Sequence, residues 1–431
     1  MKYYSLNKKS PIVNFKEATI NGQAPDKGLY FPEKLPEVSS ALIKNMENLP
    51  DAEIAFRVIA PYVGDCIPNL DLFDIVKETL NFSIPLKKVG ENISSLELFH
   101  GPTLAFKDVG ARFMSRCLGY FLKSEERKVT VLVATSGDTG GAVANGFYDV
   151  KGVNVIILYP KGRVSPVQEK QLTTLGKNII ALEVDGTFDD CQQMVKQAFI
   201  DKEIIEKRFL TSANSINVAR WLPQQFYYFV AYKQWKEKDK QPVVCVPSGN
   251  FGNICAGLLA KVTGLPLGHF IAACNVNDIV SNYLKTEKLI PKTAVATLSN
   301  AMDVGNPSNF VRIIELFQKE FPTLKNNLSS YTITDTETIE TIKRIYTQHH
   351  YTLDPHGAVA WLALEQYLEK FPDQKGFILE TAHPVKFPDA VIEATGKGVE
   401  IPHSISSMMH REKETVEIKP DFENLKDYLL A

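Results

Sequence analysis

The chain has 431 residues, of which 44% are hydrophobic and 23% charged, and its 48 basic and 50 acidic residues leave a net charge of −2. This balance argues against a nucleic-acid partner, and no apolar segment is long enough to suggest a membrane span. The length suits two or three domains, which favours a globular enzyme with a cleft between lobes.

The cysteines and the N-terminus indicate a cytoplasmic protein. Six cysteines occur without a Cys-X-X-Cys pair or a histidine at zinc-ligand spacing, so we expect reduced core thiols and no metal site. The first residues lead into Lys8 and Lys9 with no apolar segment behind them, unlike a signal peptide or an anchor. No membrane partner is therefore expected.

The first 90 residues predict a separate, mainly helical N-terminal domain. Its start is rich in turn residues and includes the sequence GLYFPE at 28–33. Helical patterns follow at 40–48, 51–62 and 70–80.

Residues 91–431 predict an α/β unit. Short β-branched segments alternate with helical patterns, which is typical of a parallel sheet covered on both faces. The expected strands lie at 129–133, 153–158, 179–184, 243–246 and 270–274. A long helical pattern covers 218–236, and the charged residues from Lys419 could form a surface helix.

The first chemical motif is LELFHGPTLAFKD at 96–108. A strand-like segment enters a Gly-Pro turn, after which Lys107 begins a helical pattern and Asp108 suits the N-cap position. A helix start and apolar neighbours both disfavour a charged ammonium, and a neutral amine is what Schiff-base chemistry requires. A solvated lysine remains the alternative for this segment taken by itself.

Two further motifs each join a strand to a helix through small residues. In VLVATSGDTGGAVA at 131–144, free N–H groups at the helix start could bind a carboxylate or a phosphate, although an ordinary capped turn would have the same pattern. In VVCVPSGNFGNICAG at 243–257, Gly249 and Gly252 allow successive N–H groups to form a phosphate nest. The latter is neither a dinucleotide fingerprint nor a Walker loop.

These motifs, together with ETAHPVKF at 380–387 and GLYFPE, resemble the threonine synthase family in its longer microbial form, in the right order along nearly the whole chain. The resemblance implies a fold-type II pyridoxal 5′-phosphate (PLP) enzyme, similar to the tryptophan synthase β-subunit. Two open, doubly wound lobes would hold PLP between them. The smaller would span about 130–240, and the larger would combine 91–129 with 241–431.

The resemblance also implies a role for individual residues. Lys107 would be the catalytic residue, which binds PLP as a Schiff base and then transfers protons. The cofactor would further contact Thr381 at its pyridine nitrogen, Asp138 beside its ring, and a phosphate loop formed by Ser248, Gly249, Asn250, Phe251, Gly252 and Asn253. Substrate contacts would come from Thr135, Ser136, Gly137, Thr139, Asn214, Ser215, Asn217, Arg220 and Lys386.

Simpler roles stay open for several of these residues. Asn217 could be a helix cap, Arg220 and Lys386 could be surface residues, and His383 could be structural. The partner of Asp138 also stays open, because many relatives of this fold type have an asparagine at that position.

The implied reaction is that of a carbon–oxygen lyase acting on phosphates, at the last step of threonine biosynthesis. O-phospho-L-homoserine and water would give L-threonine and phosphate by γ-elimination followed by addition of water at the β-carbon. A related lyase that forms 2-oxobutyrate from phosphohomoserine or phosphothreonine is the alternative, and a non-catalytic PLP-binding protein is a third. We expect a monomer or a homodimer.

Overall fold

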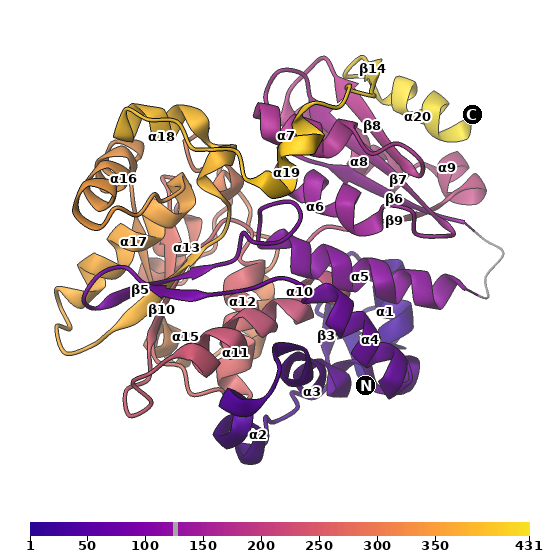
Figure 1. Ribbon diagram of the computed structural model, residues 1–431. Coiled ribbons are helices and arrows are strands. Elements are labelled where there is room, and N and C mark those ends of the chain that lie inside the picture. Colours follow the sequence, from indigo (N-terminus) through magenta and orange to yellow (C-terminus); the bar gives the residue numbers. More distant parts are fainter. Residues whose placement is uncertain (124–127) are drawn as a thin grey trace.

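The computed structural model describes residues 1–123 and 128–431 and contains three β-sheets (Figure 1). One is a small sheet in the N-terminal unit, one has six strands, and one has five. The two larger sheets form the centres of two lobes, which lie on opposite sides of Figure 1.

The N-terminal unit combines the small antiparallel sheet with four helices. The sheet has the strand order β2 (Val13–Asn14), β1 (Lys2–Ser5), β3 (Tyr30–Pro32). The α-helices are α1 (Phe15–Asn21), α2 (Ser40–Asn45), α3 (Asp51–Val63) and α4 (Asn69–Thr79), with 3-10 turns η1 (Met46–Asn48) and η2 (Gly64–Cys66). The helical patterns at 40–48, 51–62 and 70–80 therefore fall on real helices.

The predicted boundary at residue 90 is too late. Strand β4 (Leu86–Lys88) pairs antiparallel with β5 (Ile93–Glu97), and this hairpin forms one edge of the six-stranded sheet. Strand pairing thus assigns residues 86–90 to the larger lobe.

The larger lobe contains the six-stranded sheet, in which all strands except β4 run parallel. Its order is β12 (Leu328–Thr332), β11 (Phe270–Cys274), β10 (Val243–Pro247), β13 (Gly376–Glu380), β5, β4. Alternate residues of β10 face separate cores, Val244 and Val246 on one side and Val243 and Cys245 on the other. This is why the strand is apolar throughout.

The helices of the larger lobe follow its strands in the chain. They are α12 (Gly252–Val262), α13 (Ile279–Thr286), η4 (Asn300–Met302), α14 (Phe310–Leu316), α15 (Phe321–Asn327), α16 (Asp335–His349), α17 (Pro355–Leu368), η5 (Pro384–Lys386) and α18 (Pro388–Thr395).

The smaller lobe has a fully parallel five-stranded sheet. Its order is β14 (Val416–Ile418), β8 (Ile179–Val184), β7 (Val153–Pro160), β6 (Val129–Ala134), β9 (Phe209–Thr211). Its helices are α6 (Asp138–Phe147), α7 (Pro166–Thr173), α8 (Phe188–Ala198) and α9 (Lys202–Lys207). Helix α5 (Lys107–Leu122) packs on both α6 and the N-terminal α4.

The predicted division placed the C-terminal residues in the larger lobe, and the structure contradicts this. After α18 the chain continues through α19 (His403–Met409), then β14 pairs with β8, and α20 (Phe422–Leu430) packs on α8. Leu425 and Leu429 of α20 are buried in the core of the smaller lobe, so this helix is more than a surface appendage.

The helical pattern at 218–236 is interrupted. It forms α10 (Val218–Trp221), the 3-10 turn η3 (Leu222–Gln224) and α11 (Gln225–Gln234), since Pro223 cannot donate the hydrogen bond that a continuous α-helix needs. Helix α11 packs on α12 and α3, so these residues lie with the larger lobe and the N-terminal unit instead of the smaller lobe.

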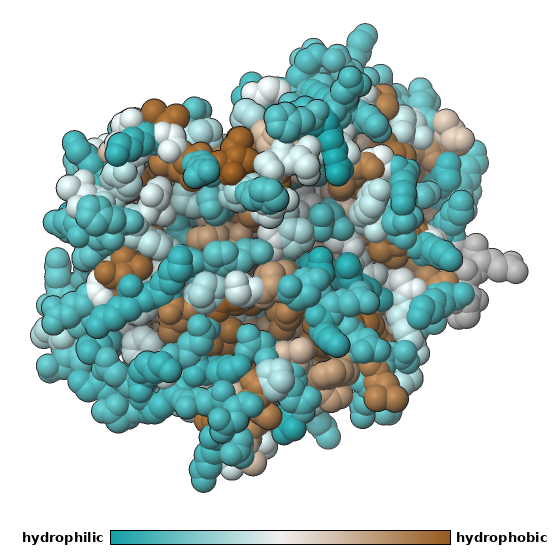
Figure 2. Space-filling view, in the orientation of Figure 1, coloured by the Kyte–Doolittle hydropathy of each residue, from teal (hydrophilic) through white to brown (hydrophobic). Residues whose placement is uncertain are grey.

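The surface is largely hydrophilic, and the cysteines lie mainly in the interior. Most of the face in Figure 2 is hydrophilic, and hydrophobic side chains show as separate patches scattered across it. All six cysteines are free and five are buried, as predicted. Across residues 1–123 and 128–431, no helix combines the length and the apolar character that a membrane crossing requires.

Candidate active site

Lys107 lies at the carboxyl end of strand β13, beside Thr381. The Phe106 N–H donates to the Thr381 carbonyl at 2.9 Å, and the His383 N–H donates to the Leu104 carbonyl at 3.0 Å. These bonds join the segment before α5 to the one after β13. Leu104 accepts a left-handed backbone with φ of 56°, and the Tyr227 hydroxyl donates to the Phe106 carbonyl, so the turn before Lys107 is held on two sides.

Asp108 is not the N-cap of α5, contrary to the prediction. The helix already begins at Lys107, and the Asp108 carboxylate accepts hydrogen bonds from the Thr103 N–H at 2.9 Å and the Thr103 hydroxyl at 2.5 Å. A β-carbon on Gly101 would lie 2.4 Å from Asp108 Oδ2, so the glycine of the Gly-Pro turn is needed for this closure. Asp108 therefore braces the turn that presents Lys107.

The surroundings of Lys107 favour its neutral form. Burial lowers the pKa of Lys107 to about 8, with smaller contributions in the same direction from Lys386 and Arg220, while Asp138 opposes them. The side chain keeps partial exposure, and its Nζ lies 5.7 Å from the centre of the Phe106 ring. At pH 7 about a tenth of an amine with this pKa is unprotonated, far more than for an ordinary lysine.

Asp138, the first residue of α6, forms a buried ion pair with Lys386. The distance from Lys386 Nζ to Asp138 Oδ1 is 2.6 Å, and Gln168 Nε2 donates to the same oxygen at 3.0 Å. Burial would raise the pKa of Asp138, but the charges of Lys386 and Lys107 hold it well below its usual value. Lys386 is 1% exposed and also donates to the Thr103 carbonyl at 2.8 Å, so it is not a surface lysine.

The loop before α6 is shaped by Thr135. Its hydroxyl accepts hydrogen bonds from the N–H groups of Gly137 at 2.9 Å and Gly140 at 2.8 Å, which directs Thr135 inward. Gly137 has φ of 137°, and a β-carbon there would lie 2.4 Å from Gln168 Cδ. Among described residues, the hydroxyls of Ser136 and Thr139 have no hydrogen-bond partner, and the N–H of Asp138 is also free.

The segment after β10 presents an uninterrupted row of free N–H donors. Within the described chain, none of the backbone N–H groups from Gly249 to Ile254 donates to an acceptor. Phe251 adopts the left-handed conformation, with φ of 61°, directly before α12 begins at Gly252. Six free donors at the start of an eleven-residue helix form a strong site for an anion.

The two glycines of this segment differ in how tightly their surroundings enclose them. A β-carbon on Gly249 would lie 2.7 Å from Met302 Cα, so no side chain fits there. A β-carbon on Gly252 would lie 3.3 Å from Asn309 Nδ2 and 3.4 Å from Ser215 Cβ. Asn309 and Ser215 thus form a wall that faces the start of α12, called the Gly252 wall below. Asn253 Nδ2 is buried with no partner, although the Asn253 oxygens accept from the Tyr228 hydroxyl.

Comparisons with known proteins agree over the whole length. Family models match the descriptions "Threonine synthase N terminus" at residues 2–80, "Pyridoxal-phosphate dependent enzyme" at 81–379 and "Threonine synthase, C-terminal" at 357–429. Proteins named threonine synthase are 44% identical in Haemophilus influenzae, covering all of both chains, and 40% identical in Saccharomyces cerevisiae, covering 91% of this chain and 88% of the relative. The chain belongs to the threonine synthase family.

Solved structures of family members have the same fold. A PLP-bound threonine synthase from Brucella melitensis superposes with a TM-score of 0.93 at 35% identity, covering 100% of this chain and 98% of that one. Threonine synthase from Escherichia coli gives 0.92 at 42% identity, covering 100% and 99%. The predicted threonine synthase family, fold class and PLP dependence are confirmed.

The predicted residues in the polar segment before α10 have different surroundings. Asn217 caps α10 through the Ala219 N–H at 2.9 Å and donates to the Thr19 carbonyl at 2.8 Å, so its amide serves the fold, as the alternative prediction held. Ser215 lies at the Gly252 wall and accepts from Asn309 Nδ2 at 3.0 Å. The Asn214 side chain has no hydrogen bond among described residues.

Arg220 is a buried residue, not a surface one. It is 3% exposed, donates to the Ala213 carbonyl, and keeps its Nε without a partner. Burial lowers the pKa of Arg220 to about 10, which leaves it charged at neutral pH.

Four residues that the sequence motifs do not mark contact the segments around Lys107, Asp138 and Gly252: Tyr227, Gln168, Asn309 and Arg312. Gln168 belongs to a capping box at the start of α7, a local pattern that gives no sign of its contact with Asp138. Arg312, in contrast, stands between the apolar pairs Phe310-Val311 and Ile313-Ile314, and a charge at such a position was a usable signal.

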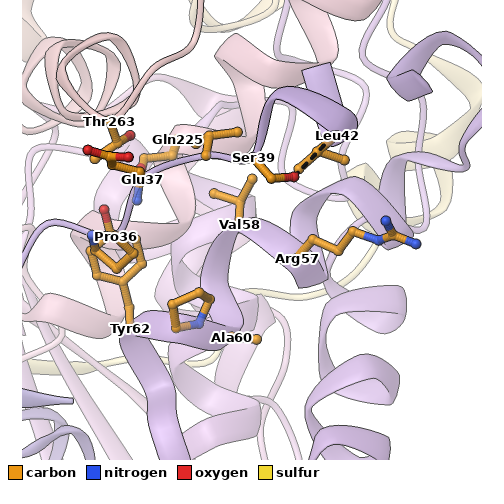
Figure 3. Close-up of a pocket in the computed structure, with 12 residues that line it drawn as sticks. Pro36, Glu37, Ser39, Leu42, Arg57, Val58, Ala60, Tyr62, Gln225 and Thr263 are labelled. Atoms are coloured by element: carbon orange, nitrogen blue, oxygen red, sulfur yellow. Dashed lines mark hydrogen bonds between the residues drawn. The ribbon is translucent and has the colours of Figure 1, made fainter. Parts of the chain in front are cut away.

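A separate cavity of about 340 Å³ lies between the N-terminal unit and α11 (Figure 3). Val58 and Tyr62 of α3, Gln225 of α11 and the segment before α2 line it, and Arg57 points away from the other labelled side chains. None of the predicted site residues lines this cavity. Across the described residues, no group of three His, Cys, Asp or Glu side chains is arranged to hold a metal ion.

Proposed function

We propose that this chain is a threonine synthase that converts O-phospho-L-homoserine and water to L-threonine and phosphate. The observation that carries the proposal is the Lys107 environment, in which a lysine of lowered pKa adjoins a buried Lys386–Asp138 pair and Arg220. The full-length similarity to proteins of that name supports the choice of reaction.

The residues present fit PLP. The six free N–H donors from Gly249 to Ile254 suit its phosphate, and the buried, unpartnered Asn253 Nδ2 is a donor that needs an acceptor. The Thr381 hydroxyl, which has no hydrogen bond among described residues, lies next to the Lys107 turn and suits the pyridine nitrogen. When bound, PLP supplies the electron sink that stabilises negative charge on the substrate's carbon atoms.

Lys107 would attach the cofactor and then act as the base. Because its pKa is about 8, the amine can accept a proton from a substrate carbon and return it at neutral pH. The turn fixed by Asp108 and Tyr227 holds this amine in place while protons move.

The loop before α6 would bind the carboxylate of the substrate. The hydroxyls of Ser136 and Thr139 and the N–H groups at the helix start are free donors, and Gly137 lets the backbone approach closely. Thr135 would keep the loop in shape through its two accepted hydrogen bonds without contacting the substrate.

The substrate phosphate would bind on the cationic side of the site. Lys386 and Arg220 contribute two buried positive charges near the carboxyl groups of Asp138 and Asp108, so an anionic substrate group would meet two cations here. Lys386 and Arg220 are the proposed phosphate contacts, and Asn214 with its free amide is a further one. Ser215, at the Gly252 wall, would contact the cofactor phosphate instead.

Product analysis tests the reaction. Purified holoenzyme is incubated with O-phospho-L-homoserine, and threonine, inorganic phosphate, ammonia and 2-oxobutyrate are measured together, with Lys107→Ala as the inactive control. We expect threonine and phosphate in equal amounts. Ammonia and 2-oxobutyrate as main products would assign the chain to the alternative lyase reaction, and no product would leave a PLP-binding protein.

We also propose a cytoplasmic protein that assembles as a monomer or a homodimer and has no nucleic-acid partner. The free, buried cysteines and the near-neutral charge support this proposal. Light scattering of the eluting protein measures the assembly, and a mass above that of a dimer would contradict it.

A further inference from the structure

Arg312 is a buried cation at the junction of three parts of the molecule. It is fully buried in α14, and its guanidinium donates to the Tyr30 carbonyl at 3.0 Å, the Ile216 carbonyl at 2.6 Å and Asn309 Oδ1 at 2.7 Å. Its guanidinium carbon lies 4.4 Å from the centre of the Trp221 ring. The residue thus joins the N-terminal GLYFPE segment to the loop before α10 and to Asn309.

The charge of Arg312 has no carboxylate partner within the described part of the chain, where all its acceptors are amide or carbonyl oxygens. Burial lowers the pKa of Arg312 to about 10, so the guanidinium stays charged at neutral pH. A buried charge without a counter-ion is costly, and proteins pair such charges or use them.

A negatively charged group could bind close to Arg312, at the free N–H donors of 249–254. Asn309, which accepts from Arg312, donates from Nδ2 to Ser215 Oγ at 3.0 Å, and its backbone N–H donates to the Asn250 carbonyl at 3.2 Å. The same Nδ2 lies 3.3 Å from the β-carbon position of Gly252. Arg312 is therefore connected to the row of free N–H donors through one intervening residue, Asn309.

That row contains no basic side chain of its own. Its six residues are Gly249, Asn250, Phe251, Gly252, Asn253 and Ile254, so the row itself would offer a phosphate dianion only neutral dipoles. Ser215 accepts its hydrogen bond from Asn309 and so keeps its own hydroxyl hydrogen to donate.

We infer that Arg312 is a positioning residue for the cofactor phosphate, which orients Asn309 and Ser215 toward that phosphate and supplies its counter-charge without touching it. The inference rests on the proposed PLP binding at Gly249–Ile254. It also gives the N-terminal unit a part in cofactor affinity, because the Tyr30 carbonyl takes two of the hydrogen bonds of Arg312.

The test compares two ligands that differ by the phosphate group. PLP and pyridoxal, which has the aldehyde but lacks the phosphate, are titrated into the full-length apoenzyme and followed by absorbance. Arg312→Met removes the charge at similar volume, and we expect PLP affinity to fall about tenfold or more while pyridoxal affinity stays unchanged. Arg344→Met, at an arginine paired with Glu365 on the surface, is the matched control and should change neither.

Charge and geometry are separated by two more measurements. Arg312→Lys keeps the charge, so the pH titration of the bound phosphate, followed by ³¹P NMR, should stay close to wild type, whereas in Arg312→Met the phosphate should take up a proton at a higher pH. If Arg312→Met does not fold, Asn309→Ala decides, because it interrupts the same relay and leaves the carbonyl contacts of Arg312 intact. It too should weaken PLP and spare pyridoxal.

The outcomes are distinct. Equal loss of both ligands in these variants would show a general structural role, and unchanged PLP affinity would show that Arg312 does not serve the phosphate; either result overturns the inference. Failure of the wild-type protein to bind PLP would instead refute the proposed function. Turnover is not needed for any of these readings.

Discussion

Glu380, the last residue of β13, offers a sharp test of the electrostatics behind the site. Its Oε1 accepts the Asp354 N–H at 2.7 Å, while its Oε2 is buried with no partner. Burial raises the pKa of Glu380 well above 4.5, and the nearby charges of Asp354 and Glu97 raise it further. His356 holds Asp354 through a 2.5 Å contact between Nδ1 and Oδ1.

The sign of the effect follows from proton linkage. Above pH 4.5 the unfolded chain releases the Glu380 proton while the folded protein keeps it, so stability falls as pH rises toward the folded pKa. The slope from one such group is about 1.4 kcal/mol per pH unit. For a chain of this length the unfolding entropy is roughly 0.9 kcal/mol per kelvin, so the slope corresponds to about 1.5 °C per pH unit if the protein unfolds as one unit.

The assay is thermal unfolding of wild type and Glu380→Gln between pH 5.5 and 6.5. Glutamine stays neutral throughout, so the melting temperature of wild type should fall by about 1.5 °C relative to the variant across this interval. Glu417→Gln is the control: a hydrogen bond from Lys161 lowers the pKa of Glu417, which is not among the groups that act on Glu380, so its titration falls below pH 4.5 and its effect should be flat here. Parallel curves for wild type and Glu380→Gln would refute a protonated Glu380.

Three other predictions concern the cofactor directly. Lys107→Ala should abolish covalent attachment and reduce turnover drastically, and borohydride reduction with peptide mapping should place the label of wild type on Lys107 and on no other lysine. Gly252→Val should weaken PLP binding in a titration, because the added carbons meet Asn309 Nδ2, which is already 3.3 Å from the β-carbon position; unchanged affinity in a folded variant would move the phosphate elsewhere. Thr381→Val should bind PLP less tightly, because the pyridine nitrogen loses its partner. Thr381→Asp should raise the proton affinity of that nitrogen and increase the ratio of 2-oxobutyrate to threonine. If both variants match wild type in absorbance spectrum and product ratio, Thr381 is not at the ring.

Local chemistry accounts for what could be predicted. The strands at 179–184 and 270–274 are strands in the structure because buried parallel strands are continuously apolar, and glycine segments follow the strands β6 and β10 because close approach needs small residues. The loop at 248–253 was predicted as a phosphate nest, and its free N–H donors are consistent with that prediction.

The errors share a different cause. Asp108 was expected as a cap because of its place at the start of a helical pattern, yet its carboxylate accepts hydrogen bonds from the N–H and the hydroxyl of Thr103 instead. Asn217 and Ser215 are two residues apart, but a hydrogen bond to the Thr19 carbonyl holds the first in the fold, whereas the second lies beside Gly252.

The sequence by itself determined the order of the strands along the chain, the loops that end them and the lysine at the start of α5, because these depend on residues within a few positions of one another. The tertiary structure alone decided that Lys386 reaches Asp138, that Arg312 contacts Asn309 behind the free N–H groups of 249–254, and that β14 completes the sheet of the other lobe. Such pairings join residues far apart in the chain, and the free energy that selects among them comes from burial and the satisfaction of buried charges. No local pattern records that selection.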